Sequence, residues 1–164
     1  MSNAILYRMN SGIPGDVSRR QSATIESGFY DSGAAFPGYG LFGKIVSGKF
    51  DPIGAGDTAA NVYGALVRPY PTTGLNASDP LGTAVPPTSG VCNILRRGYM
   101  TVKNNAGTAS LGSQVYVRVA AAAAGKPIGG IEAASDTTNT IAITGATFMS
   151  AADASGNVEI AFNI

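Results

Sequence analysis

PGYGLFGKIVSGKFDPIGAGDTAANVYGALVRPYPTT, residues 37–73, is the densest run of large apolar residues in the chain and decides the fold class. Its glycines recur at such short intervals that no window is long enough for a stable helix. Residues 42–46 and 49–50 predict two short strands joined by a tight turn at Ser47-Gly48. Residues 62–67 predict a third strand, which is ended by two closely spaced prolines. The stretch therefore predicts a small antiparallel meander.

The composition of the whole chain agrees with this prediction. The 164 residues include 23 isoleucines and valines against only 7 leucines, and β-branched side chains favour strands. The 22 glycines and 9 prolines indicate many turns. We expect a mainly β protein with a single antiparallel domain, sandwich or barrel-like (jelly-roll-type), with long loops. An extended N-terminal arm, residues 1–24, would precede the β domain, residues 25–164.

Further strands are expected on both sides of the meander. The segments are residues 23–30, a strand pair within 91–102 with a bend or bulge at Arg96-Arg97-Gly98, residues 114–119, and three closing strands within 128–134, 140–149 and 157–164. In 114–119 the valines alternate with Gln114, Tyr116 and Arg118, which predicts a strand with one buried and one outward face. Residues 72–90 predict a long loop, and loops of this length are often functional.

The charge of the chain is nearly balanced, with 11 basic and 10 acidic residues. A nucleic-acid-binding protein normally has a basic excess, so no nucleic-acid partner is expected. The arm alone is basic, because it holds Arg8, Arg19 and Arg20 against only Asp16. Two interpretations stay open: the arm is a solvated polar terminus, or it docks on an acidic partner.

The cysteine content and the hydropathy of the chain bear on two further features, disulfide bonds and membrane spans. Cys92 is the only cysteine, which excludes an internal disulfide, and its apolar neighbours predict that it is buried. No stretch approaches the roughly 18 apolar residues of a membrane span, and no signal peptide is visible. We therefore expect no membrane partner.

The sequence offers no catalytic constellation. It contains no histidine, the commonest general base and metal ligand. The aspartates lie in turn-like contexts, where the side chain bonds its own backbone. Only Glu26, Glu132 and Glu159 fall on expected strands, and their spacing singles out no pair. We expect no enzymatic activity, no catalytic residues, no metal and no cofactor.

Residues 38–43 match two glycine-rich phosphate-binding patterns, but their context does not support either of them. Both patterns need a buried strand before the loop and a helix after it, so that the helix N-terminus meets the phosphate. Here Pro37 precedes the glycines, and Gly48 and Pro52 prevent a helix after them. These glycines are interpreted as turn residues of the meander.

The order of several short motifs in the first half of the chain is similar to a known family. They are GIPGDVSR at residues 12–19, YGLFGK at 39–44, GD at 56–57 and YGALVRPYPT at 63–72. Together they resemble the structural cement proteins of tailed bacteriophages, which are small capsid-decoration proteins. Residues 125–131 and 158–162 are similar to that family only in style.

The resemblance implies a β-rich protein that binds the outer capsid surface of the virion as a small homo-oligomer, a dimer or a trimer. Such a protein would be made in the host cytoplasm, would contact the major capsid protein and would reinforce contacts between capsomers without catalysis. We hypothesise that the arm and the long loop make the capsid contacts. The candidate residues are Arg8, Pro14, Arg19 and Arg20 in the arm, and Asn76 and Asp79 in the loop.

A carbohydrate-binding or adhesin-type β module on a virion or cell surface is the alternative. Sugar sites usually need exposed aromatic rings that stack on the sugar faces. The chain has no tryptophan, and Tyr39, Tyr63 and Tyr70 lie in the apolar meander, where core packing is the expected role.

Overall fold

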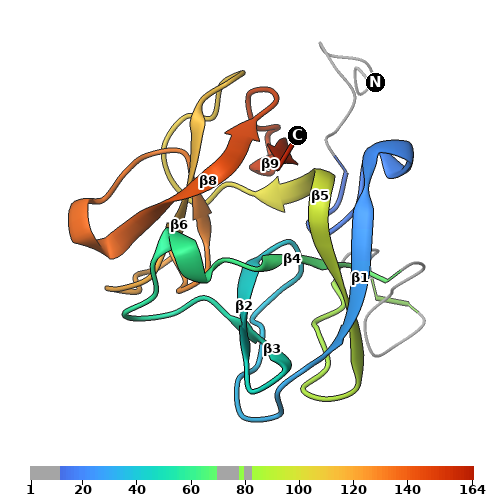
Figure 1. The fold of residues 1–164 in the computed structure, drawn as a ribbon. Coiled ribbons are helices and arrows are strands. Elements are labelled where there is room, and N and C mark those ends of the chain that lie inside the picture. Colours follow the sequence, from blue (N-terminus) through green and yellow to red (C-terminus); the bar gives the residue numbers. More distant parts are fainter. Residues whose placement is uncertain (1–11, 70–77, 80–82) are drawn as a thin grey trace.

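The computed structural model describes residues 12–69, 78–79 and 83–164, in which an antiparallel sheet curls into a half-barrel (Figure 1). Its strands are β1 (Thr24–Phe29), β2 (Phe42–Val46), β3 (Lys49–Pro52), β4 (Gly64–Val67), β5 (Val91–Lys103), β6 (Gln114–Arg118), β7 (Ile131–Glu132), β8 (Thr140–Phe148) and β9 (Asn157–Phe162). The described residues also form three short 3-10 helices: η1 (Arg20–Ser22) before β1, η2 (Ala59–Asn61) before β4 and η3 (Thr137–Asn139) before β8. The mainly β, barrel-like prediction is confirmed.

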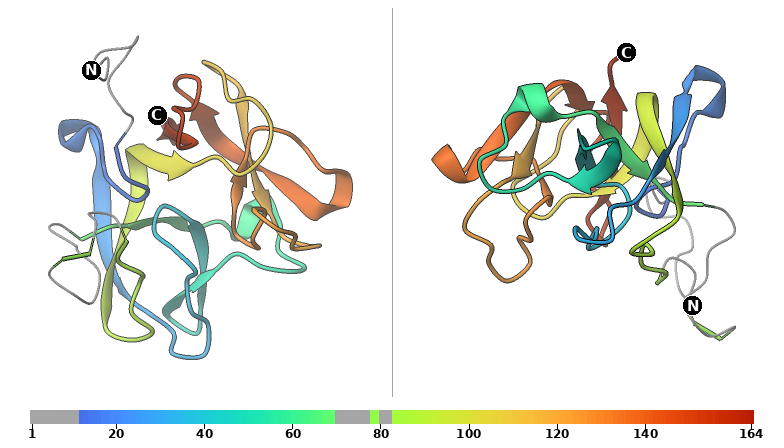
Figure 2. Two further views of the ribbon diagram at one scale, coloured as in Figure 1. Left: turned by 180° about the vertical axis from the view of Figure 1, so that it is seen from behind. Right: turned by 60° about the horizontal axis from the view of Figure 1, so that its bottom comes forward.

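Strand β5 connects the two halves of the sheet. The strand order is β3-β2-β4-β5-β9-β8-β6-β7, and β1 pairs with β5 beside this path. Residues 91–97 of β5 pair with β1, whereas residues 98–103 pair with β9. The strands of the first part of the chain therefore gather apart from those of the last part, as Figure 2 shows from behind and from below.

The expected strand pair within residues 91–102 is wrong, because these residues form one strand of 13 residues. The expected bend is present: β5 changes its partner between Arg97 and Gly98. Gly98 has φ +139°, and a Cβ there would lie 3.0 Å from Ala23 Cα. A glycine is therefore needed where the strand turns from one half to the other.

The meander forms as expected around a two-residue turn. Ser47 and Gly48 have φ of 50° and 79°, and Val46 pairs with Lys49, so β2 and β3 form a tight hairpin. Strand β4 begins at Gly64, two residues later than expected, because η2 and its capping box at Thr58 occupy the residues before it. At Gly64 a Cβ would lie 2.6 Å from the carbonyl oxygen of Leu95, so this glycine permits the close approach of β4 to β5.

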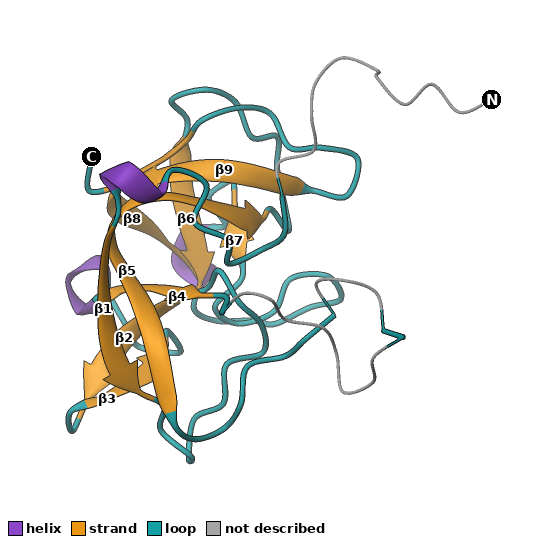
Figure 3. Cartoon of the chain, turned by 90° about the vertical axis from the view of Figure 1, so that its right-hand side faces the viewer, coloured by secondary structure: helices purple, strands orange, loops and turns teal. Residues whose placement is uncertain are grey.

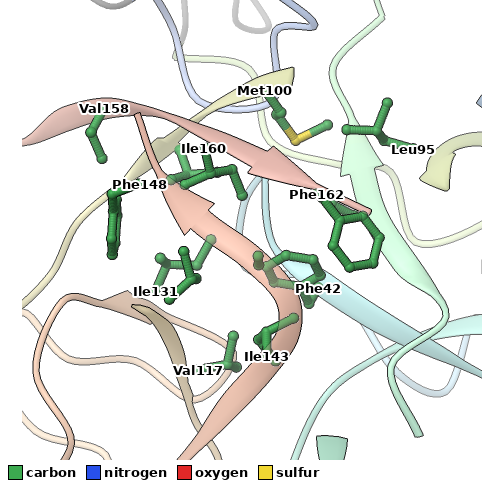
Figure 4. Packing of buried hydrophobic residues seen from close by; sticks show 14 of the residues in the cluster. Phe42, Leu95, Met100, Val117, Ile131, Ile143, Phe148, Val158, Ile160 and Phe162 are labelled. Carbon is green, nitrogen blue, oxygen red and sulfur yellow. The ribbon is translucent and has the colours of Figure 1, made fainter. Parts of the chain in front are cut away.

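All four residues of β4 are buried, because the strand separates two apolar clusters. Ala65 and Val67 face the larger cluster, and Leu66 faces the smaller one. The larger cluster joins the two halves and includes Phe42, Leu95, Met100, Val117, Ile131, Ile143, Phe148, Val158, Ile160 and Phe162 (Figure 4). The smaller cluster holds Tyr30, Phe36, Tyr39, Leu41, Phe50, Leu66, Cys92 and Ile94, so Cys92 is buried as expected.

The expectation that Arg118 lies on an outward face of β6 is wrong. Val115 and Val117 are buried as predicted, but Arg118 is only 1% exposed. Its Nε donates to Glu132 Oε1 at 2.6 Å, and its Nη2 donates to Asp136 Oδ2 at 2.7 Å. The pairing of β6 with β7 places Glu132 beside the strand, so the guanidinium is neutralised inside the protein.

The three helices have three residues each, and none in the described part of the chain is long and apolar enough to cross a membrane.

Candidate partner-binding surface

Residues 15–18, which the sequence assigns to the arm, lie along β5 in the described structure. The Gly15 N–H donates to the Thr101 carbonyl at 2.8 Å, and the Thr101 N–H donates to the Asp16 carbonyl at 2.9 Å. The Ser18 N–H donates to the Tyr99 carbonyl at 3.1 Å. These bonds are on the opposite edge of β5 from β9, so the segment adds a further, irregular strand to the sheet.

Arg19 ties the end of this segment to β9. Its Nε and Nη2 donate to the two carboxylate oxygens of Glu159 at 3.1 and 2.6 Å, and its guanidinium lies 4.0 Å from the Tyr99 ring centroid. The Ser18 hydroxyl donates to the same carboxylate at 2.6 Å. The hydrogen bond with Glu159 raises the pKa of Arg19. The guanidinium of this candidate residue is therefore already bound within the protein.

Arg68, after β4, holds the segment from the other side. Its Nε donates to the Pro14 carbonyl at 2.9 Å and its backbone N–H to the Gly15 carbonyl at 2.9 Å. Its guanidinium lies 4.5 Å from the Tyr39 ring centroid, and its Nη1 donates to the Ala84 carbonyl at 3.3 Å. Burial lowers the pKa of Arg68. The sequence analysis missed this role; the signal was an arginine between a buried strand and a proline.

A cleft of about 600 Å³ lies between this N-terminal segment and the sheet. One wall is the segment itself, and the other includes Ile25 of β1, Val67 of β4 and Asn93 of β5. Its remaining lining residues are Gly12, Asp16, Val17, Ser18, Arg20, Arg68, Pro69 and Thr101. Arg20 is exposed at the start of η1, and the described residues offer it no ion pair. The cleft thus combines apolar side chains with polar and charged ones, among them the Asp16 carboxylate and Arg20, which has no ion pair among the described residues.

The sheet beside the cleft is exposed along β1. Most residues of β1 are exposed, including Ile25 at 44% and Phe29 at 61%. Phe29 lies opposite Val91 of β5, which is 64% exposed, and Ile25 lies opposite Leu95. Residues opposite each other in antiparallel strands point to the same face, so these apolar side chains share one face with the cleft. Figure 3 shows β1 and β5 side by side.

The structure brings three of the six candidate contact residues together. Pro14 lies directly before the docked segment (residues 15–18), and Arg19 and Arg20 lie directly after it, whereas Asp79 is half-buried in the separate stretch 78–79. Arg8 and Asn76 lie outside the described residues. The sequence analysis predicted a strand at residues 23–30 but did not include it in the candidate surface, because the exposure of β1 on both faces is not expressed in any motif.

The two described tyrosines that were considered for sugar stacking, Tyr39 and Tyr63, have other roles. Tyr39 is 5% exposed in the smaller cluster, which confirms its expected core packing. The Tyr63 hydroxyl donates to Glu26 Oε2 at 2.7 Å, and the Arg96 guanidinium lies 3.5 Å from the Tyr63 ring centroid. Tyr70 lies outside the described residues. Neither described ring offers an open platform.

Among the described residues, no group of three or more histidine, cysteine, aspartate and glutamate side chains is arranged to hold a metal ion. The N-terminal segment, the cleft and the exposed strand β1 lie next to one another and together form the candidate partner-binding surface.

The comparisons with known proteins identify a family and a shared fold. A family model described as XM1 gp53 minor capsid protein matches residues 1–162. No curated protein matches the chain. A solved structure, the capsid of Myoviridae phage XM1, contains a similar chain with 22% sequence identity and a TM-score of 0.69. The match covers 99% of this chain and 97% of that chain, so the fold is shared over the whole domain.

Proposed function

The chain belongs to the XM1 gp53 minor capsid protein family, and from this premise we propose that it is a cement protein. As a member of the family it is a structural protein of a phage and is located in the virion capsid. In the proposed role it binds the outer capsid surface, contacts the major capsid protein and stabilises the contacts between capsomers without catalysis. The family match over residues 1–162 is the observation that carries this proposal.

The architecture suits a protein that acts by adding interface. A specific interface typically covers about 800 Å² on each partner, and repetition over the shell makes the sum large. Because a ligand that binds only the assembled state stabilises that state, binding to the expanded shell would oppose its disassembly. The docked segment with Pro14, Arg19 and Arg20 offers a rigid surface for such contacts. Arg8, Asn76 and Asp79 complete the proposed set of contact residues.

We also propose that the protein is a small homo-oligomer, a dimer or a trimer. Exposed apolar side chains outside the cleft, on the β2–β3 hairpin and before β6, include Ile45, Val46 and Leu111. Such side chains are common at contacts between subunits. The mass of the purified protein in solution distinguishes a monomer from either oligomer.

Co-sedimentation with expanded capsids that lack the protein tests the proposed function. The expected result is saturable binding at a fixed ratio to the shell protein, together with a higher melting temperature of the shell. Bovine serum albumin, a protein without a capsid role, serves as the control for trapping in the pellet. Absence of saturable binding would contradict the cement role and leave only the capsid location given by the family.

A further inference from the structure

We propose that the open edge of β1 pairs with an extended segment of the capsid shell, whose apolar side chains enter the neighbouring cleft and whose carboxylate meets Arg20. This inference rests on the proposed function and identifies the surface that would perform it. The segment would add a strand to the sheet, a mode of recognition in which backbone hydrogen bonds give affinity and side-chain pockets give specificity.

β1 is an edge strand that lacks the usual protection. Sheet edges are commonly shortened or covered, because unpaired N–H and C=O groups attract other strands. β7 has two residues, and residues 104–106 cover its free edge through bonds such as Asn105 N–H to the Ile131 carbonyl at 2.8 Å. β3 has four residues, and its residue Phe50 forms an isolated parallel β-bridge with Tyr30. Within the described residues, β1 has no second partner along Thr24–Phe29.

The direction of the β1 backbone groups follows from one hydrogen bond. The Tyr30 N–H donates to the Gly90 carbonyl at 2.9 Å, so the backbone of Tyr30 points towards the β5 side. Alternate residues of an antiparallel strand point to the same neighbour, so Gly28 and Glu26 also face β5. The N–H and C=O groups of Ser27 and Ile25 therefore point away from the sheet, towards the incoming segment.

The side chains beside this edge specify what kind of segment fits. Ile25, Phe29 and Val91 are exposed on one face, and Ile25 also lines the 600 Å³ cleft. An incoming strand with apolar side chains at alternate positions would cover this face and fill the cleft. Arg20 lies in the cleft lining without an ion pair among the described residues, so a carboxylate on the segment would complement it.

A second copy of this chain fits the edge poorly. In a two-fold antiparallel pair of β1 strands, one residue lies opposite its own copy on the axis. With Glu26 there, two carboxylates of like charge would lie directly opposite each other, which is destabilising. With Ser27 on the axis, residue 24 of the second copy would lie opposite Tyr30, where Phe50 of β3 already lies. With Ile25 on the axis, the pair would extend into η1 and across the irregular register between Thr24 and Ile25. A segment from the shell is not bound by this symmetry and can pair with residues 24–28 alone.

A proline substitution at Ser27 tests the strand pairing directly. Ser27→Pro removes an outward N–H and blocks the edge but breaks no hydrogen bond to β5, because that N–H points away from β5. Ser27→Thr is the matched control, since it keeps the N–H and favours a strand. In co-sedimentation with expanded capsids lacking the protein, we expect Ser27→Pro to bind about tenfold more weakly or worse, the effect of roughly one lost hydrogen bond. Ser27→Thr should bind like the wild type.

A second pair of variants covers the case in which Ser27→Pro lowers the melting temperature. Phe29→Ser removes an exposed apolar side chain beside the edge, and Val46→Ser removes one on the β2–β3 hairpin. Only Phe29→Ser should weaken capsid binding. If the wild type binds and both Ser27→Pro and Phe29→Ser bind equally well, the inference about β1 is overturned while the cement role stands. If the wild type itself does not bind, the proposed function fails, and the inference about β1 fails with it.

Discussion

Arg19 and Glu159 form a two-point ion pair between the N-terminal segment and β9, with Nη2 2.6 Å from Oε2 and Nε 3.1 Å from Oε1. The two residues are 140 positions apart in the sequence. Arg19 also covers the ring of Tyr99, so one side chain connects the segment to both β5 and β9. The beginning of the described chain and its last strand are thus held as one unit.

Arg19→Ala should loosen the segment while the sheet stays folded. Exposed ion pairs contribute about 0.5–1 kcal/mol, so the loss in the free energy of unfolding should be of that size. Hydrogen exchange should accelerate at the Ser18 and Thr101 amides, which bond across the segment and β5. Arg20→Ala is the matched control, because Arg20 has no ion pair among the described residues, and it should leave both amides protected. Equal exchange rates of these amides in the two variants would contradict the role of the Arg19–Glu159 ion pair in holding the segment.

Glu132→Ala should be strongly destabilising, because it leaves the Arg118 charge buried with one exposed partner. Breaking a buried ion pair in this way typically costs about 3–5 kcal/mol. Arg118 and Glu132 have side chains only 2% and 1% exposed, whereas Asp136 is 41% exposed. Asp136→Asn is therefore the control and should cost clearly less. Urea denaturation of the three proteins measures the difference.

The double variant Arg118→Met/Glu132→Leu distinguishes two causes of instability, an unpaired buried charge and lost hydrogen bonds of Arg118. If the cost of Glu132→Ala comes from the uncompensated guanidinium, removing both charges should restore part of the stability. A double variant that is no more stable than Glu132→Ala would show that the hydrogen bonds of Arg118 to the Ala120 and Ala121 carbonyls dominate instead.

Asp51→Asn should increase stability at neutral pH, and the gain should shrink in acid. Asp51 is 8% exposed, and its Oδ1 has no hydrogen-bond partner in the described structure. Burial, followed by the nearby Asp31 charge, raises the pKa of Asp51 above its ordinary value. A carboxyl whose folded pKa is raised favours folding below its unfolded pKa of about 3.9, and this contribution is lost as the pH rises through the folded pKa.

Urea unfolding between pH 3.5 and pH 7 measures this effect, a range set about the ordinary pKa of aspartate. We expect a gain of about 1 kcal/mol for Asp51→Asn at pH 7, because a neutral amide costs less to bury than a carboxylate, and this gain should fall towards zero near pH 4. Asp57→Asn is the control and should lower the stability, because the Asp57 carboxylate accepts hydrogen bonds from Lys44 Nζ at 2.7 Å and from the Gly54 N–H at 2.8 Å. A gain for Asp51→Asn that grows in acid would contradict the assignment.

The parts of the fold that depend on local chemistry could be predicted from the sequence. The β2–β3 hairpin follows from Ser47-Gly48, and β9 follows from its alternating side chains. β5 was split into two strands because Gly98 has the local signature of a turn. Its continuation depends on a change of partner from β1 to β9, which only the three-dimensional arrangement determines.

The buried arginines and the docked segment depend on residues far away in the sequence. Arg118 meets Glu132 and Asp136, and Arg68 meets the Pro14 carbonyl, 54 positions earlier. The N-terminal segment joins β5 mainly through backbone groups, which any sequence provides and which leave no motif. The side-chain patterns therefore did not predict where this segment lies.

Arg20→Glu should weaken capsid binding, because it reverses a charge in the cleft lining that has no ion pair among the described residues. Opposite charges across an interface accelerate association and the effect is screened by salt. We expect roughly tenfold weaker binding at about 50 mM salt and a difference that narrows at about 500 mM. Lys126→Glu is matched in charge change and lies in the turn between β6 and β7, outside the cleft lining.

Co-sedimentation with expanded capsids at both salt concentrations distinguishes a specific contact from a change in net charge. A loss confined to Arg20→Glu would support contact at the cleft, because Lys126→Glu changes the net charge of the protein by the same amount. Equal losses in the two variants would mean that the capsid responds only to overall charge. Equal binding of Arg20→Glu and the wild type would remove Arg20 from the proposed contacts and leave the β1 edge to be tested by its own variants.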